Sequence, residues 1–365
     1  MNRLIPIIAA AAVMTACSGK KTQQETEEPA TVTPAQTLIA RLDSTVNAGK
    51  FYFGHHDDTA YGHTWAYVDG NSDVKAVTGQ YPGMMNWDLG LLELDSLQNL
   101  DGVPFEFMSR EIAAQHARGG INGISWHPIN PVSRGNSWDT STSPLHGFTD
   151  NPAVLDTLTA WIDRAADFIG SLTDSEGHRI PVIFRPWHEN SGSWFWWGSD
   201  YTTPDEYIAL YRLTRERFDA KDLDNVVWAY SPDKDLTREQ YLATYPGDEY
   251  VDILGTDIYQ FDGEEGIDKF RERVAAQMPF VIDEARRRGK LVALTETGLE
   301  GLTVPDWYTR VLLPAIDGMP LAYVCVWRNG NESTHPNHYY VPFPGHPAVD
   351  DFKKFHDTGK ALFID

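Results

Sequence analysis

The chain has 365 residues, of which 42% are hydrophobic and 12% aromatic, and its formal net charge is -22. This length suits one large domain or two or three average ones. The acidic balance argues against a nucleic-acid or anionic-membrane partner and suits an enzyme with a neutral substrate.

The N-terminus has the pattern of an export signal. Arg3 precedes an apolar stretch, residues 5–14, which is too short to span a bilayer. Thr15-Ala16-Cys17 follows and resembles a bacterial lipobox, in which the cysteine is acylated after cleavage. We therefore expect residues 1–17 to be a lipoprotein signal peptide with Cys17 as its lipidation site. Ordinary cleavage beside an incidental cysteine is the alternative.

Residues 18–34 are polar and predict a flexible tether, and residues 35–365 predict one domain because no later stretch has linker composition. We expect a monomer in the bacterial cell envelope that meets the membrane only through its lipid. No acidic cluster follows Cys17, which favours the periplasm over the outer surface. Cys325 is the only other cysteine, so neither a disulfide framework nor a cysteine metal site is possible.

Short apolar runs alternate with amphipathic segments along this domain. We predict strands at Phe51–His55, Val74–Tyr81, Ile121–His127, Ile180–Trp187, Asn225–Tyr230, Val251–Tyr259, Leu291–Thr297 and Leu321–Trp327. We predict helices at Pro104–Gly119, Pro152–Leu172, Pro204–Asp219, Gly266–Gly289 and Val304–Leu313. Eight strands alternating with helices predict an α/β fold, a single-domain (β/α)8 TIM barrel. A doubly wound open sheet is the alternative, but no Gly-x-Gly-x-x-Gly follows the first strand.

Polar residues gather where the predicted strands end, and catalytic groups of such barrels come from these ends. Glu189 follows the fourth strand and Glu296 ends the seventh. If both point to the barrel axis, their carboxyl groups can lie about 5 Å apart, which is the geometry of a retaining glycosidase. The aromatic residues that follow Glu189, residues 194–197, suggest a sugar substrate.

The surroundings of the two glutamates predict different roles. Glu189 lies among Trp187, His188 and Trp194, whose bulk should raise its pKa and suit it to general acid/base catalysis. Glu296 has only Thr and Gly beside it and should act as the nucleophile, with Tyr259 as a possible hydrogen-bond donor. An internal ion pair of either glutamate, for example with Arg185, is the alternative.

The stretch from Phe184 to Asn190, Phe-Arg-Pro-Trp-His-Glu-Asn, is followed by Trp194 and Trp196-Trp197-Gly198 and resembles glycoside hydrolase family 26. The resemblance covers most of residues 48–345. It includes Trp126-His127-Pro128, Asp257-Ile258-Tyr259, Thr295-Glu296-Thr297-Gly298 and Trp327-Arg328-Asn329. The family consists chiefly of β-1,4-mannanases with a retaining (β/α)8 barrel, which here implies a lipoprotein member of the Bacteroides type.

The resemblance also implies roles for individual residues. Glu189 would be the acid/base with His188 beside it, and Glu296 the nucleophile held by Tyr259. Trp194 and Trp327 would line the sugar subsites around the bond that is cut. Arg328 would contact a sugar further toward the non-reducing end, and His127 would bond the substrate near that bond.

Five residues have competing interpretations. His127 precedes Pro128 and could instead be a core histidine. Trp138 is either an outer sugar platform or a loop-packing residue. His55 and His56 point to opposite faces of a strand and cannot share an ion, so we expect one of them, His55, to face the cleft and we expect no metal. Asp88 could bind sugar hydroxyls or cap the following helix, and we interpret it as the cap.

Together these features predict a retaining β-1,4-mannanase that needs no cofactor and acts on mannan, galactomannan or glucomannan. Either endo action or release of mannobiose is possible. Residues 335–340 and the loop of Trp138 are candidates for the wall that would decide between them. The same machinery acting on mixed-linkage glucan or β-1,3-xylan, or a non-catalytic glycan-binding lipoprotein, are the alternatives.

Overall fold

The computed structural model describes residues 32–365. The expected signal peptide, Cys17 and most of the expected tether lie outside the described residues. Within the described part of the chain, no helix is both long enough and apolar enough to cross a bilayer.

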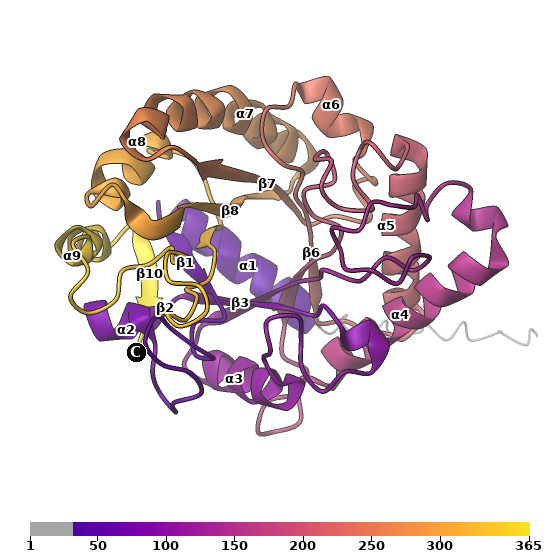
Figure 1. Ribbon diagram of the computed structural model, residues 1–365, viewed down its shortest axis with the longest axis horizontal. Coiled ribbons are helices and arrows are strands. Elements are labelled where there is room, and N and C mark those ends of the chain that lie inside the picture. Colours follow the sequence, from indigo (N-terminus) through magenta and orange to yellow (C-terminus); the bar gives the residue numbers. More distant parts are fainter. Residues whose placement is uncertain (1–31) are drawn as a thin grey trace, which may run out of the picture. The chain divides into compact units, whose positions relative to one another are not determined.

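Eight parallel strands form a closed barrel in the described chain, which confirms the predicted (β/α)8 fold (Figure 1). They are β1 (Phe51–His56), β3 (Met84–Asp88), β4 (Ile121–Ser125), β5 (Val182–Arg185), β6 (Val226–Tyr230), β7 (Ile253–Gln260), β8 (Leu291–Leu299) and β9 (Tyr323–Val326). Each pairs with its neighbour in this order, and β1 also pairs with β9, which closes the ring.

Helices cover the outside of the barrel, except that the first of them lies across one end (Figure 1). They are α1 (Pro34–Asn47), α2 (Asp73–Thr78), α3 (Phe105–Ala117), α4 (Pro152–Ser171), α5 (Pro204–Asp219), α6 (Arg238–Ala243), α7 (Ile267–Arg288), α8 (Leu313–Ala315) and α9 (Val349–Asp357). Capping boxes at Thr33 and Thr203, each followed by a proline, start α1 and α5. Thr33 and Pro34 therefore belong to the folded domain, although the sequence assigned them to the tether.

The predicted second strand, Val74–Tyr81, is wrong. This segment forms α2 because Ser72 caps its N-terminus and Val74 and Val77 are buried on one helical face. Gly79, with φ of 87°, ends the helix in a left-handed conformation. The second barrel strand is instead β3, and Tyr81–Pro82 forms β2, which pairs antiparallel with the C-terminal β10 (Ala361–Ile364).

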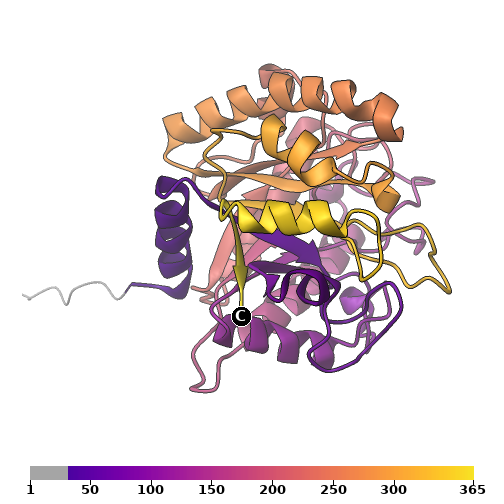
Figure 2. The same ribbon diagram turned by 90° about the vertical axis from the view of Figure 1, so that its left-hand side faces the viewer.

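The strands divide the core into two layers because alternate side chains point to opposite faces. One layer lies between strands and helices and includes Phe53 and Phe184. The other fills the barrel interior, where Leu38 and Leu42 of α1 pack against residues such as Tyr52. Figure 2 shows α1 across one end of the barrel, at the N-terminal ends of the strands. The opposite end is left for the polar residues that follow the strands.

Candidate active site

A cavity of about 210 Å³ lies at the C-terminal ends of the strands. Eight of the ten site residues that the sequence predicts within the described chain line it. Its lining consists of His127, Trp138, His188, Glu189, Trp194, Phe195, Tyr259, Glu296, Trp327, His338 and Tyr340. Arg328 and His55 lie elsewhere.

The loop after β5 holds Glu189 in an unusual backbone conformation. Trp187 and Glu189 have φ angles of 53° and 52°, a left-handed region that non-glycine residues seldom adopt. Surrounding contacts enforce it: the Trp187 indole donates to Thr214 Oγ1 at 2.9 Å, and the Glu189 N–H donates to the Ser231 carbonyl at 2.8 Å. Glu189 is thereby turned into the cavity.

The environment of Glu189 favours its protonated form. Burial raises the pKa of Glu189 well above its ordinary range, and repulsion from Glu296 and Asp257 raises it further. The Trp194 indole donates a hydrogen bond of 2.7 Å to Glu189 Oε2. A carboxyl group that keeps its proton near neutral pH can serve as a general acid.

Glu296 accepts hydrogen bonds at both carboxylate oxygens. The Tyr259 hydroxyl donates to Oε2 at 2.7 Å, and Arg185 donates to Oε1. Arg185 also donates to Asp257 Oδ2 at 2.9 Å, and the Thr295 hydroxyl holds the other oxygen of Asp257 at 2.6 Å. The Arg185 ion pair considered from the sequence thus exists at Glu296, and it orients the carboxylate rather than removing it from the cavity.

Three carboxylates converge at this point. One oxygen each from Glu189, Asp257 and Glu296 lies within 4.8 Å of the others, close to the predicted separation of the two glutamates. Such a cluster could attract a cation, but the guanidinium of Arg185 already pairs with Asp257 and Glu296. The short separation of Glu189 and Glu296 is the spacing of a retaining pair.

A chain of three residues borders the two glutamates. His127 Nδ1 donates to Asp88 Oδ2 at 2.6 Å, and His127 Nε2 lies 3.1 Å from His188 Nε2. Burial lowers the pKa of His188 well below its usual value, and the positive charge of Arg185 lowers it further. Burial opposes the charged form of His127 too, but Asp88 outweighs burial and raises the pKa of His127. Of the two rings, His127 is therefore the one whose charged form the surroundings favour.

Asp88 is not the helix cap that the sequence suggested. Burial alone would raise its pKa, but His127 and the Gly90 N–H, which donates at 2.7 Å, lower the pKa of Asp88 to about 2. Asp88 therefore stays charged and fixes the His127 ring at the edge of the cavity.

The expectation that His55 faces the cleft is wrong. His55 is buried and bonds Asp58, with 2.6 Å between Nδ1 and Oδ1. In β1, His55 is on the same face as Phe53, which points outward to the helices, whereas His56 is on the same face as Tyr52, which points into the barrel. The His56 ring lies 4.1 Å from the Trp327 ring, so His56 supports the floor of the site.

The aromatic residues near Glu189 separate into two groups. Trp194 lines the cavity, whereas Trp196 and Trp197 are fully buried and pack around Trp187. These two residues support the loop and do not form a sugar platform. Trp138 is 48% exposed and stacks on His127 at 5.6 Å, so it forms part of the cavity wall.

Arg328 lies in a neighbouring groove of about 630 Å³. Its guanidinium pairs with Asp101 at 2.9 Å and lies over the Tyr61 ring. Neither partner was identified from the sequence, because they come from loops after β1 and β3, more than 200 positions before Arg328. The groove also includes His335, while His338 and Tyr340 line the catalytic cavity, so the loop expected to form a wall reaches both spaces.

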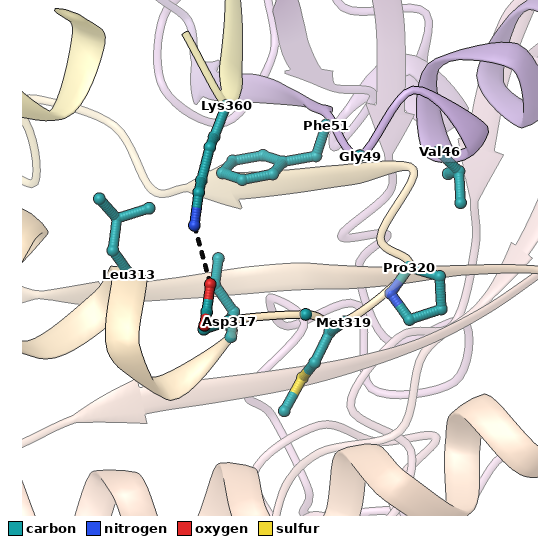
Figure 3. Close-up of a pocket in the computed structure, with 10 residues that line it drawn as sticks. Val46, Gly49, Phe51, Leu313, Asp317, Met319, Pro320 and Lys360 are labelled. Carbon is teal, nitrogen blue, oxygen red and sulfur yellow. Dashed lines mark hydrogen bonds and ion pairs between the residues drawn. The ribbon is translucent and has the colours of Figure 1, made fainter. Parts of the chain in front are cut away.

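Another cavity, of about 270 Å³, lies at the opposite end of the barrel (Figure 3). It is mainly apolar and contains an ion pair of 2.8 Å between Lys360 and Asp317. Neither glutamate of the candidate site lines it. The smaller cavity at the C-terminal ends is therefore the one that carries the catalytic groups.

We expect Asp88→Asn to lower the pKa of His127, because burial is then opposed only by the charges of Glu296 and Asp101. In the unchanged protein the raised pKa means that the charged pair stabilises the fold fully below pH 6.5. This contribution is lost as the pH rises through the native pKa. NMR titration of the His127 ring in both proteins measures the difference, and equal pKa values would contradict the ion pair.

Relatives of known activity share this architecture. The chain is 31% identical to a mannan endo-1,4-beta-mannosidase of Bifidobacterium adolescentis over 88% of its own length, and it spans 34% of that protein. It is 30% identical to a mannan endo-1,4-beta-mannosidase of Bacillus subtilis, covering 70% of this chain and 69% of the relative. A GH26 beta-mannanase structure from Bacteroides ovatus superposes with a TM-score of 0.87 at 44% identity, covering 91% of this chain and 95% of the other.

The family model described as glycosyl hydrolase family 26 matches residues 27–297, which include both Glu189 and Glu296. This match confirms the resemblance drawn from the sequence. The chain belongs to glycosyl hydrolase family 26.

Proposed function

We propose that the chain is a retaining glycoside hydrolase that cleaves β-1,4-mannosidic bonds in mannan, galactomannan or glucomannan. The approach of the Glu189 and Glu296 carboxylates to within 4.8 Å carries this proposal. At that separation one carboxylate can attack the sugar directly, whereas an inverting enzyme must leave room for a water molecule. The similar proteins from Bifidobacterium adolescentis and Bacillus subtilis are mannan endo-1,4-beta-mannosidases, which supports mannan as the substrate.

The two glutamates divide the reaction between them. An oxygen of Glu296 forms a bond to the anomeric carbon while the bond to the leaving oxygen breaks, and Glu189 gives that oxygen its proton. Glu189, now a carboxylate, then takes a proton from a water molecule, which attacks the anomeric carbon and releases Glu296. Tyr259 and Arg185 hold Glu296 in place throughout.

The remaining cavity residues bind the sugar chain. Trp327 and Trp194 offer ring faces on which pyranose rings stack. His127 and His188 border the bond to be cut, and Trp138 limits the cavity on its exposed side. Arg328 contacts a sugar in the neighbouring groove, toward the non-reducing end.

We propose further that Cys17 carries a lipid and that the residues before it are removed, so that the enzyme is anchored in the cell envelope and faces the periplasm. The full-length protein should then sediment with membranes and resist protease added to intact cells, and Cys17→Ser should appear in the soluble fraction. Identical distribution of both proteins would contradict the anchor.

Glu189→Ala should lower kcat/KM on mannan by about 100-fold or more, because no group then protonates the leaving oxygen. An aryl β-mannobioside whose phenol leaves without a proton should be affected much less. The alkaline limb of the pH profile, which reports loss of the Glu189 proton as the pH rises through its raised pKa, should also disappear. An equal loss on both substrates would contradict the acid role.

The product profile on linear mannan and mannohexaose tests the substrate assignment. Mixed oligosaccharides at early times would indicate endo action, and mannobiose alone would indicate release from chain ends. Glu296→Ala serves as the control. This variant should bind mannohexaose but produce nothing, unlike the unchanged enzyme. If the chain were a non-catalytic binding protein, the variant and the unchanged protein would both produce nothing. Absence of product from the unchanged protein would contradict mannan and direct the test to mixed-linkage glucan and β-1,3-xylan.

A further inference from the structure

We propose that Phe261 and Lys234 extend the catalytic cavity into a platform that binds the sugars of the leaving fragment. The inference rests on the proposed function, with Glu189 as the acid. Phe261 directly follows β7, at the C-terminal end of the barrel where the catalytic cavity lies, and it is 53% exposed. Its ring is therefore accessible to a ligand that extends beyond the cavity.

Lys234 connects Phe261 to the catalytic cavity. Its Nζ lies 5.7 Å from the centre of the Phe261 ring and 5.4 Å from the centre of the Trp194 ring. Cation–π attraction favours both contacts. Asp233 holds the Lys234 ammonium at 2.7 Å, and the Asp233 N–H donates to Ser191 Oγ at 2.9 Å. The platform is therefore fastened to the loop that carries Glu189.

The contacts of Trp194 place the platform on the leaving-group side. The Trp194 indole donates to Glu189, and Glu189 delivers its proton to the leaving oxygen. The surface that continues beyond Trp194, to Lys234 and Phe261, therefore faces the sugars that depart with that oxygen. The nucleophile Glu296, by contrast, faces the sugar that remains.

The barrel topology agrees with this direction. Arg328, Tyr61 and Asp101 form their groove on the loops after β9, β1 and β3. Lys234 and Phe261 follow β6 and β7, which lie across the ring from β1 and β3 in the strand order (Figure 1). A glycan that begins in the Arg328 groove and crosses the two glutamates therefore continues over the platform.

The chemistry of the platform suits a neutral β-linked pyranose chain. The C–H face of a pyranose can stack on the Phe261 ring, which has no polar group of its own. The Lys234 ammonium has three donors, of which Asp233 takes one, so two remain for sugar hydroxyls. Neither group selects a particular epimer, so the platform should contribute affinity and register rather than specificity for mannose.

Cleavage of mannopentaose, with 18O at its reducing end to locate the broken bond, tests the platform. In Phe261→Ala the ratio of kcat/KM on mannopentaose to kcat/KM on an aryl β-mannobioside should fall about threefold to tenfold, because the aryl substrate has no leaving sugars to stack. Cleavage should also shift toward shorter leaving fragments. Lys234→Met should shift it in the same direction.

Two control variants match these changes. Leu97 is 88% exposed and lines neither the catalytic cavity nor the Arg328 groove, so Leu97→Ala should keep the original ratio. Lys221 pairs with Asp167 at 2.7 Å, as Lys234 pairs with Asp233, so Lys221→Met removes a similar ion pair outside the cleft.

An unchanged ratio and cleavage pattern in Phe261→Ala would overturn the platform, even if both activities fell together. If the unchanged protein leaves mannopentaose intact, the proposed substrate is wrong. In that case the ratio of kcat/KM on cellopentaose to kcat/KM on an aryl β-cellobioside, compared between Phe261→Ala and the unchanged protein, decides whether the platform exists.

Discussion

The buried pairing of Arg185 with Asp257 and Glu296 is the constraint on which the candidate site depends. These three residues come from β5, β7 and β8, and each is at most 4% exposed. Burial would lower the pKa of the Arg185 guanidinium, but the two carboxylates outweigh burial and raise it, so the cation persists. Moving any one of the three strand ends would leave a buried charge without its partner, which is costly.

The same network reaches the other glutamate. Arg185 donates to Ser231 Oγ at 3.0 Å, and the Ser231 carbonyl accepts the hydrogen bond of the Glu189 N–H. The spacing of the two glutamates is therefore set by backbone and side-chain contacts beneath them, before any substrate arrives. Preorganisation of this kind reduces the rearrangement needed in the transition state.

Two carboxylates so close together can divide the reaction only if their environments differ. Glu296 lies between Arg185 and Tyr259, which both donate to it. Glu189 has the Trp194 indole as its donor and the negative charges of Glu296 and Asp257 nearby, and its pKa is raised. The protein thus holds one carboxylate beside a cation and keeps the other one protonated.

The sequence predicts the barrel and both glutamates because buried parallel strands appear as apolar runs and their polar ends stand out. It misplaces the second strand because β-branched residues suggested a strand in a short segment, although the spacing of Val74 and Val77 fits a helix. It selects His55 instead of His56 because both faces of β1 are buried, so alternation alone does not show which face points into the barrel. The roles of Asp101, Lys234 and Phe261 depend on loops that only the folded barrel brings together.

The anomeric configuration of the first product tests the central claim most directly. Proton NMR of borohydride-reduced mannopentaose during hydrolysis, recorded before mutarotation, distinguishes the two possible anomers of the newly formed reducing end. Attack by Glu296 followed by attack of water inverts the anomeric carbon twice, so the β-anomer should appear first and the α-anomer only later. An α-anomer at the earliest times would mean a single displacement by water and would contradict the assignment of Glu296 as nucleophile.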